Sequence, residues 1–519
     1  MNAVGGRCTS IEDSLAQDRA ASERAAADSA AKASADAERA RQAREAALDA
    51  ERERIDLARE NYMAIAAFLL VLGGLSLAGA ALLATKGQRR NAIIAGVAGG
   101  VGAPAFLAAQ AAPIKVGVLH SLSGTMAISE APIKEVVLMA IDEINRAGGV
   151  LGRKVEPVVE DPASNWDLFA EKARKLLLQD RVAAVFGCWT SVSRKSVLPV
   201  FEKHNGLLFY PVQYEGEECS KNVIYTGATI NQQATPAIDY LMSPEGGARK
   251  RFYLLGSDYV YPRTTNKILR LYLTRVKRVP AANIAEEYTP FHHQDYQTIV
   301  GKIKSFSAAG DAAVINTING DSNVPFFKEL ANQGVTADRT PVMSFSFAEV
   351  ELQTLDVKPL VGHLAAWNYF MSLKTPENLR WVKAWKEWAR TRGIPDKQAV
   401  TDDPMMHAYV HVHLWARAVQ KAESTEVDRV LRALEGLQIQ SPVGKYKVDE
   451  QNHHTWKPVY IGRIREDGQF EVVWKTRDWV RPEPWSSVTY PNRGCDWSKG
   501  GKGTFDLVNG KRVWLSDRS

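Results

Sequence analysis

Cysteine is scarce in this chain, which has four in 519 residues. They are Cys8, Cys188, Cys219 and Cys495, and no two of them have the Cys-x-x-Cys spacing of a zinc or redox motif. The sequence therefore argues against a disulfide-rich scaffold and against a structural zinc site. If this part of the chain is exported, Cys188 and Cys219 could pair, and the sequence leaves open whether they do so or stay separate buried thiols.

A marked excess of one charge is also lacking, because 65 Lys and Arg face 59 Asp and Glu, for a net charge of +6. There is no stripe of Lys and Arg with interleaved aromatic residues, so we expect no nucleic-acid partner. Hydrophobic residues make up 45% of the chain, and 13 Trp, 16 Tyr and 16 Phe can fill cores and line a pocket. At this length, two or more core-bearing units are expected.

Catalytic motifs are missing as well. No Gly-x-Ser-x-Gly elbow occurs, and the segment Gly500–Thr504 resembles a phosphate loop only until Lys502, which is followed by glycine. His407 and His411 lie one helical turn apart, but no third metal ligand accompanies them. We therefore expect a protein that is not an enzyme and that has no metal and no cofactor.

Residues 9–60 contain no glycine, proline or aromatic residue, and Arg alternates with Asp and Glu among frequent alanines. This composition predicts that residues 1–60 form a long exposed helix. Large apolar residues are too few for sustained heptads, which disfavours a coiled coil. We assign this extension no chemistry.

Residues 61–85 are a candidate transmembrane helix, because the stretch from Tyr62 to Thr85 has no charged residue and is rich in Leu, Ala, Ile and Val. A helix of this length spans a hydrocarbon core of about 30 Å. A second uncharged stretch follows after the basic residues Lys86, Arg89 and Arg90.

Residues 86–112 have the parts of a signal peptide in their usual order: the basic cluster, an apolar segment over 92–107 and an Ala-x-Ala site at 109–111. Either translation starts downstream of Met1, or residues 62–112 form a membrane hairpin with its basic loop in the cytoplasm. Both accounts place the rest of the chain in the periplasm, with a membrane anchor under the second. The choice between the Sec and Tat routes stays open.

From Ile114 onward, short apolar runs alternate with amphipathic segments. The runs expected to be buried strands are 114–120, 182–187, 207–210, 252–256, 312–316 and 341–344. The segments expected to be helices are 133–147, 166–179, 193–204, 264–276, 296–305 and 323–333. This alternation predicts an α/β fold with parallel sheets, in which ligands bind beyond the carboxyl ends of the strands.

The residues just after these strands are mainly aromatic, hydroxyl and amide side chains, with one or two carboxylates and few cations. Such a lining suits a small neutral solute with many N–H donors, because each donor buried without an acceptor costs about 1–3 kcal/mol. The same residue types also cap helices and shape turns, so position alone does not decide their role.

Several of these segments are similar to urea-type substrate-binding proteins of ABC transporters, which belong to the type I periplasmic-binding-protein superfamily. The resemblance covers about 114–484, and its motifs are Leu122–Glu130, Gly187–Ser191, Arg194–Pro199, Tyr210–Gly216, Gly256–Tyr259, Asn319–Asn323, Ala366–Phe370 and Asn452–Pro458. It implies a domain over 113–485 with two α/β lobes joined by three crossovers and no chemical reaction. The lobes would comprise 114–230 with 370–440, and 231–369 with 441–480.

The resemblance also implies a ligand cage. A related amide-sensing regulator of amidase operons binds its ligand with residues that match Trp189, Ser191, Tyr210, Tyr259 and Ser346. Where that regulator has Thr and Pro after its Tyr-Pro, this chain has Val212 and Gln213, so the Gln213 amide would replace a hydroxyl contact. Asn319, Asp321 and Glu349 are further candidate acceptors.

The expected function is therefore an extracytoplasmic binding protein that delivers urea or a short-chain amide to ABC permease subunits in the membrane. The alternative is an amide-sensing regulatory protein of the same fold, for which an export segment would have no use. An amide hydrolase is disfavoured because no nucleophile and base pair is visible. The C-terminal tail, 486–519, matches nothing in the family and is assigned no role.

Overall fold

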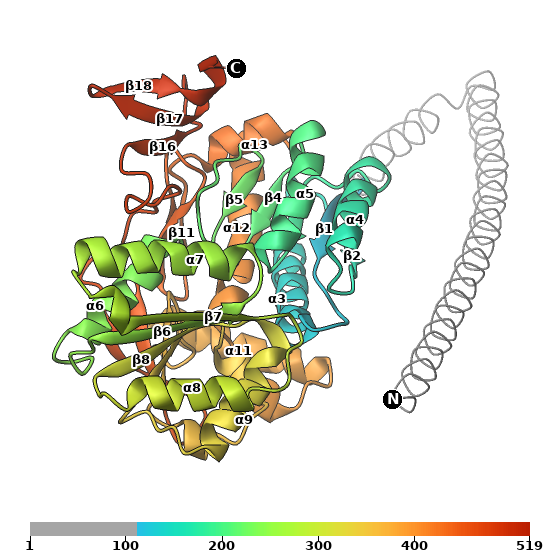
Figure 1. The fold of residues 1–519 in the computed structure, drawn as a ribbon. Coiled ribbons are helices and arrows are strands. Elements are labelled where there is room, and N and C mark those ends of the chain that lie inside the picture. Colours follow the sequence, from blue (N-terminus) through green and yellow to red (C-terminus); the bar gives the residue numbers. More distant parts are fainter. Residues whose placement is uncertain (1–111, 519) are drawn as a thin grey trace, which may run out of the picture. The chain divides into compact units, whose positions relative to one another are not determined.

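The computed structural model describes residues 112–518 (Figure 1). The predicted helical extension, transmembrane candidate and signal-like segment lie outside the described residues. Within residues 112–518, none of the helices combines the length and apolar character needed to cross a membrane.

The first lobe is built on a five-stranded parallel sheet in the order β2-β1-β3-β4-β5. These short strands are rich in Val, Ile, Leu and Phe, and β1, β3, β4 and β5 are almost wholly buried, as expected for a parallel sheet covered on both faces. Their bounds are β1 Ile114–Leu119, β2 Val155–Glu160, β3 Val185–Gly187, β4 Leu208–Tyr210 and β5 Val223–Tyr225.

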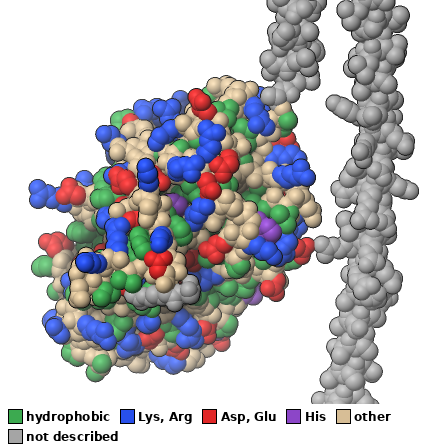
Figure 2. Space-filling model, turned by 90° about the horizontal axis from the view of Figure 1, so that it is seen from above, with side chains coloured by type: hydrophobic (Ala, Val, Ile, Leu, Met, Phe, Trp, Pro, Cys, Tyr) green, Lys and Arg blue, Asp and Glu red, His purple; other side chains and the backbone are tan. Residues whose placement is uncertain are grey.

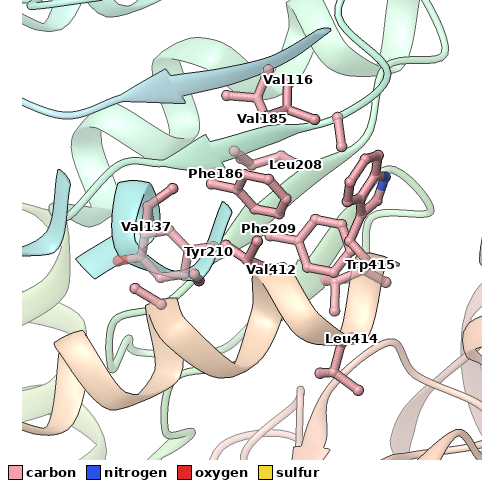
Figure 3. Packing of buried hydrophobic residues seen from close by; sticks show 14 of the residues in the cluster. Val116, Val137, Val185, Phe186, Leu208, Phe209, Tyr210, Val412, Leu414 and Trp415 are labelled. Atoms are coloured by element: carbon pink, nitrogen blue, oxygen red, sulfur yellow. The ribbon is translucent and has the colours of Figure 1, made fainter. Parts of the chain in front are cut away.

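Helices from two separate parts of the chain cover this sheet. They are α3 Ala127–Arg146, α4 Trp166–Leu178, α5 Ser191–Lys203, α11 Pro376–Thr391, α12 Asp403–Ala422 and α13 Val427–Leu434. Figure 3 shows Phe186 and Phe209 of the sheet packed against α12. The ring centroid of Phe186 lies 5.9 Å from that of Trp415. The long sequence gap between β5 and α11 is occupied by the second lobe.

The second lobe contains a seven-stranded sheet in the order β15-β14-β10-β9-β8-β6-β7, in which β14 runs antiparallel to both of its neighbours and the other pairs are parallel. Its strands are β6 Arg251–Ser257, β7 Ile284–Thr289, β8 Ala312–Thr317, β9 Val342–Ser344, β10 Leu364–Trp367, β14 Tyr460–Ile464 and β15 Phe470–Lys475. Its helices are α6 Ala234–Met242, α7 Val260–Leu271, α8 Gln297–Ser307, α9 Asn323–Asn332 and α10 Glu349–Leu352. Two hydrophobic clusters, one containing α8 and α9 residues and the other α6 and α7 residues, form its core. The expected two-lobed α/β fold with parallel sheets is therefore confirmed.

The boundary expected at residue 441 differs in the structure. Residues 438–456 form a small antiparallel sheet of β11 Gln438–Ser441, β12 Gly444–Val448 and β13 Thr455–Trp456. Val443, Tyr446 and Val448 are buried in the core of the first lobe, so this sheet packs there and the chain enters the second lobe only afterwards.

The chain crosses between the lobes three times, and these three crossover segments meet at the buried side-chain amide of Asn368. The Asn368 side-chain Nδ2 donates to the carbonyl oxygens of Gln232 (2.9 Å) and Pro458 (2.7 Å), which lie on the other two crossovers. The Lys457 ammonium donates to the carbonyl of Gly227 (2.8 Å), and burial lowers the pKa of Lys457 to about 7. Polar side chains thus connect the three chain segments that cross between the lobes, and we call these segments the hinge.

The C-terminal tail forms a three-stranded antiparallel sheet of β16 Arg493–Asp496, β17 Gly503–Val508 and β18 Lys511–Trp514 (Figure 1). A disulfide joins Cys495 of β16 to Cys219. Cys188 is free and buried, and burial raises the pKa of its thiol. The pairing of Cys188 with Cys219, left open by the sequence, is therefore wrong, because Cys188 ends a core strand while Cys219 faces the tail.

The face seen in Figure 2 carries Lys and Arg side chains interspersed with Asp and Glu. Charges of both signs are therefore mixed on this face.

Candidate functional site

The candidate site lies where the carboxyl ends of strands from both lobes face each other. Trp189 follows β3 and Tyr210 ends β4 in the first lobe, while Asn319 follows β8 and Ser346 follows β9 in the second. The alternation of strand and helix places these residues on facing edges, because every parallel strand in a sheet points the same way. All four side chains are buried.

Two hydrogen bonds cross between the lobes at this point. The indole N–H of Trp189 donates to Oδ1 of Asn319 (3.2 Å), and Nε2 of Gln213 donates to Oγ of Ser346 (2.6 Å). These four predicted residues therefore form two pairs, each of which joins one lobe to the other.

Two tyrosines flank these contacts. The Tyr210 hydroxyl donates to the carbonyl oxygen of Trp189 (2.5 Å), which fixes its ring in the first lobe. Tyr259, just before α7, is half-buried, and its ring centroid lies 4.7 Å from that of Phe291. Burial and then the neighbouring Tyr210 hydroxyl raise the pKa of Tyr259 well above its usual value, so both tyrosines remain neutral donors.

Two buried polar atoms in this cluster, Oε1 of Gln213 and the hydroxyl of Tyr261, make no hydrogen bond of regular geometry among residues 112–518, although the Tyr261 hydroxyl lies beside the Gln213 and Ser346 side chains. Tyr261 was not predicted, although it stands two residues after Tyr259 in the same strand-end segment. Burial raises the pKa of its hydroxyl, and Ser346 and Gln213 beside it oppose that shift. A buried polar atom that is poorly hydrogen-bonded costs up to about 1–3 kcal/mol, so these two atoms are candidate contacts for a polar solute. We call Gln213, Tyr261 and Ser346 the polar triad.

Ser191 lies behind the cluster instead of in it. Its hydroxyl donates to the Glu215 carboxylate and accepts from Nη1 of Arg194 (3.1 Å). Arg194 is fully buried and also pairs with Glu215 (3.1 Å) and Glu218 (3.0 Å). Its Cζ lies 4.8 Å from the centroid of the Tyr210 ring. Sequence reasoning missed Arg194 as a support, although it is one helical turn after Ser191.

The pKa of the Glu218 carboxyl shows how strongly Arg194 affects its neighbours. Burial alone would raise the pKa of its carboxyl, but Arg194 and Lys195 outweigh burial and lower the pKa to about 2. Glu218 is therefore ionised, and the buried guanidinium is neutralised by its carboxylate partners.

Asp321 lies at the edge of the site. Its carboxylate accepts from Oγ1 of Thr125 in the first lobe (2.5 Å) and contacts Nδ1 of His292 (2.7 Å). The Thr125 contact is a third link between the lobes, and we infer that Asp321 helps to hold them together.

Glu349 is placed at the hinge. Its Oε1 accepts from the backbone N–H of Met371 on the second crossover (2.8 Å), whereas Oε2 has no hydrogen-bond partner among the described residues. Burial raises the pKa of Glu349 to about 8, with weaker contributions from the nearby carboxylates of Asp403 and Glu351. The structure thus brings together Trp189, Tyr210, Gln213, Tyr259, Asn319 and Ser346. The side chains of Ser191, Asp321 and Glu349 are hydrogen-bonded to other partners, and their contact with a solute stays a prediction.

The two histidines of α12 are buried and differ in surroundings. Nδ1 of His407 contacts the Tyr446 hydroxyl (2.7 Å), and the His411 ring stacks on Phe186 at 5.0 Å between centroids. Burial lowers the pKa of both rings, so they are neutral parts of the hinge and core. Within residues 112–518, no group of three or more His, Cys, Asp or Glu side chains is arranged to hold a metal ion.

Comparisons with known proteins agree with this architecture. A 157-residue segment is 29% identical to limonene hydroxylase of Geobacillus stearothermophilus, covering 30% of this chain but only 25% of that protein. The Leu/Ile/Val-binding protein BraC3 of Rhizobium johnstonii is 24% identical over 353 residues, which are 67% of this chain and 90% of the relative.

A solved structure has the same fold. It is a solute-binding protein of an ABC transporter from Rhodopseudomonas palustris, crystallised with p-hydroxybenzoic acid. The TM-score is 0.61 at 19% identity, with 72% of this chain and 98% of that chain covered. The family described as periplasmic binding protein domain matches residues 114–491. This chain therefore belongs to the periplasmic binding protein domain family.

Proposed function

We propose that this protein is the extracytoplasmic solute-binding component of an ABC importer, and that it holds urea or a short-chain amide between its lobes without a chemical reaction. It would deliver the solute to permease subunits in the membrane. The proposed ligand contacts are seven side chains that gather between the lobes. They are Trp189, Tyr210, Gln213, Tyr259, Asn319 and Ser346, which the sequence predicted, and Tyr261, which it did not.

The polar triad carries this proposal. Oε1 of Gln213 is an unpaired acceptor that matches a solute N–H, and the Tyr261 hydroxyl can donate to a solute carbonyl. The Ser346 hydroxyl accepts from Gln213, so its own hydrogen can be donated to the neighbouring Tyr261 hydroxyl or to a solute. Urea and small amides present both N–H and C=O groups, which are the partners that these acceptor and donor side chains need.

The charges around the site favour a neutral solute over a carboxylate. Arg194 lies against the Tyr210 ring, but its guanidinium is already paired with Glu215 and Glu218. A carboxylate ligand would find tyrosine hydroxyls and an arginine that is already paired, and burying a charge without a partner of its own is costly. The names of the relatives, Leu/Ile/Val-binding and p-hydroxybenzoate-bound, define the ligands that compete with this proposal.

The disulfide supports a location outside the cytoplasm. The Cys219–Cys495 bond joins residues 276 positions apart, and such bonds persist in oxidising compartments. The predicted signal-like segment agrees with this location. A cytoplasmic location would instead favour the amide-sensing regulator.

Calorimetric titration of the full chain is the direct test of the ligand. We expect urea, formamide or acetamide to bind, and isoleucine and p-hydroxybenzoate to give no binding heat. The bound solute should also stabilise the fold by about 2.7 kcal/mol at a hundred times its dissociation constant. Binding of isoleucine or p-hydroxybenzoate with no response to the three amides would contradict the proposal.

Substitutions in the polar triad test the site. Gln213→Leu should weaken urea binding roughly 5- to 150-fold, because a buried solute N–H would lose its acceptor at a cost of about 1–3 kcal/mol. Tyr261→Phe should weaken binding by a smaller factor, since only the hydroxyl is removed. Tyr272→Phe is the matched control, because its hydroxyl donates to Asp239 on the surface of the second lobe. Unchanged affinity in both triad variants would remove these residues from the site.

A further inference from the structure

The loop of residues 213–219 connects the ligand site to the C-terminal tail. It begins with Gln213 of the polar triad and ends with Cys219 of the disulfide. Between them, Glu215 and Glu218 pair with Arg194. One face of this loop therefore belongs to the site, and its far end is covalently bound to β16.

The tail also contacts the middle of the loop. The backbone N–H of Glu217 donates to the carbonyl oxygen of Pro484 (2.6 Å), and the Thr489 hydroxyl donates to the Glu217 carboxylate (2.7 Å). Gly216 has φ +71°, and a Cβ at this position would lie 2.7 Å from the Pro484 oxygen. Residues 484–495 therefore press closely on the loop, and only glycine permits this approach.

The covalent part of this contact lies beyond the matched family domain, which ends at residue 491, whereas the second cysteine is residue 495. The tail then continues into β17, which pairs with β16, and β18, which pairs with β17, so Cys495 lies in an ordered sheet. The disulfide thus fastens the site loop to a folded module instead of to a free chain end.

We propose that the Cys219–Cys495 disulfide is a positioning element of the ligand site, which holds the 213–219 loop so that Gln213 is presented to the solute before binding. This inference rests on the proposed binding function. An ordered loop spares the solute the cost of ordering it, because immobilising flexible side chains on binding is unfavourable. Cutting the bond should therefore weaken binding by roughly two- to tenfold while the lobes stay folded.

The test compares the full wild-type chain with the Cys219→Ser/Cys495→Ser double variant. Hydrogen exchange followed by mass spectrometry is expected to show faster exchange in 213–221 and unchanged exchange in the strands β6 and β8. Titration with urea is expected to show the two- to tenfold loss of affinity. Lys502→Ala is the matched control, because it removes an exposed ion pair with Asp517 within the tail and leaves the disulfide intact.

Reduction gives a second arm on the wild-type protein. Dithiothreitol supplies two electrons and two protons, which convert the disulfide to two thiols while the reagent becomes its own cyclic disulfide. Reduced wild type should match the double variant, and reoxidation should restore affinity. Unchanged exchange in 213–221 would overturn the inference, as would faster exchange with unaltered urea affinity. If wild type binds no urea, the proposed ligand fails, and loop exchange alone then decides whether the bond positions the loop.

Discussion

Replacing Arg194 with methionine is expected to lower the free energy of unfolding by about 3–5 kcal/mol, the usual effect of breaking a buried ion pair by removing one partner. Methionine fills similar volume, so the loss would come from charge. Glu215 and Glu218 would stay buried without their guanidinium, and Tyr210 would lose the cation beside its ring. Denaturation should be followed in guanidinium chloride, because urea is the proposed ligand.

The pH dependence separates this charge effect from a packing defect. The folded-state pKa of Glu218, about 2, is below its ordinary value of 4.5, so this carboxylate stabilises the fold above pH 4.5. That contribution is lost as the pH falls toward 2. The difference in the free energy of unfolding between wild type and Arg194→Met should thus be largest at neutral pH and become smaller in acid. Arg465→Met, which removes an exposed pair with Asp467, should cost about 1 kcal/mol or less. If the free energies of unfolding of wild type and Arg194→Met differed by the same amount at pH 3 and pH 7, this account would be contradicted.

Glu349→Gln is expected to stabilise the protein increasingly as the pH rises. The folded-state pKa of Glu349, about 8, is above its ordinary value of 4.5, so between these values the folded chain retains a proton that the unfolded chain releases. Wild-type stability should therefore fall by up to about 1.4 kcal/mol for each pH unit in this window. Glutamine has no proton to lose and can still accept from the Met371 N–H.

Guanidinium chloride denaturation at several pH values measures this effect. The variant and wild type should have similar stability near pH 4.5, and the variant should be more stable by about 4 kcal/mol at pH 8. Glu466→Gln, at an exposed position, is the control and should follow the wild-type curve at all pH values. A constant difference between Glu349→Gln and wild type across this range would show that Glu349 is ionised in the folded protein.

The sequence was sufficient to predict the α/β fold of the lobes, because the patterns that mark strands and helices are local in the sequence. The apolar runs at 252–256 and 312–316 correspond to β6 and β8, and the helix expected at 166–179 corresponds to α4. The edge strand β2 was not predicted. It contains Pro157, which weakens a strand signal in sequence but is tolerated at a sheet edge.

The candidate site was predictable in part for the same reason. Residues that directly follow strands, such as Trp189 and Ser346, are placed by the sheet itself, so their meeting was foreseeable. Ser191 and Glu349 have equally suitable side chains. Their position depends on neighbours distant in sequence, Glu215 for the first and Met371 for the second. Whether these residues bind solute stays a prediction.

The sequence by itself determined the alternation of strand and helix, and with it the parallel sheets and the chemistry at their carboxyl ends. Only the tertiary structure decided which of those side chains face one another, because the bond from Gln213 to Ser346 joins residues 133 positions apart. It also decided that Cys219 pairs with Cys495 and that Glu349 is buried among carboxylates. Burial, electrostatic interaction and covalent pairing depend on distances in space, and the order of residues along the chain does not specify those distances.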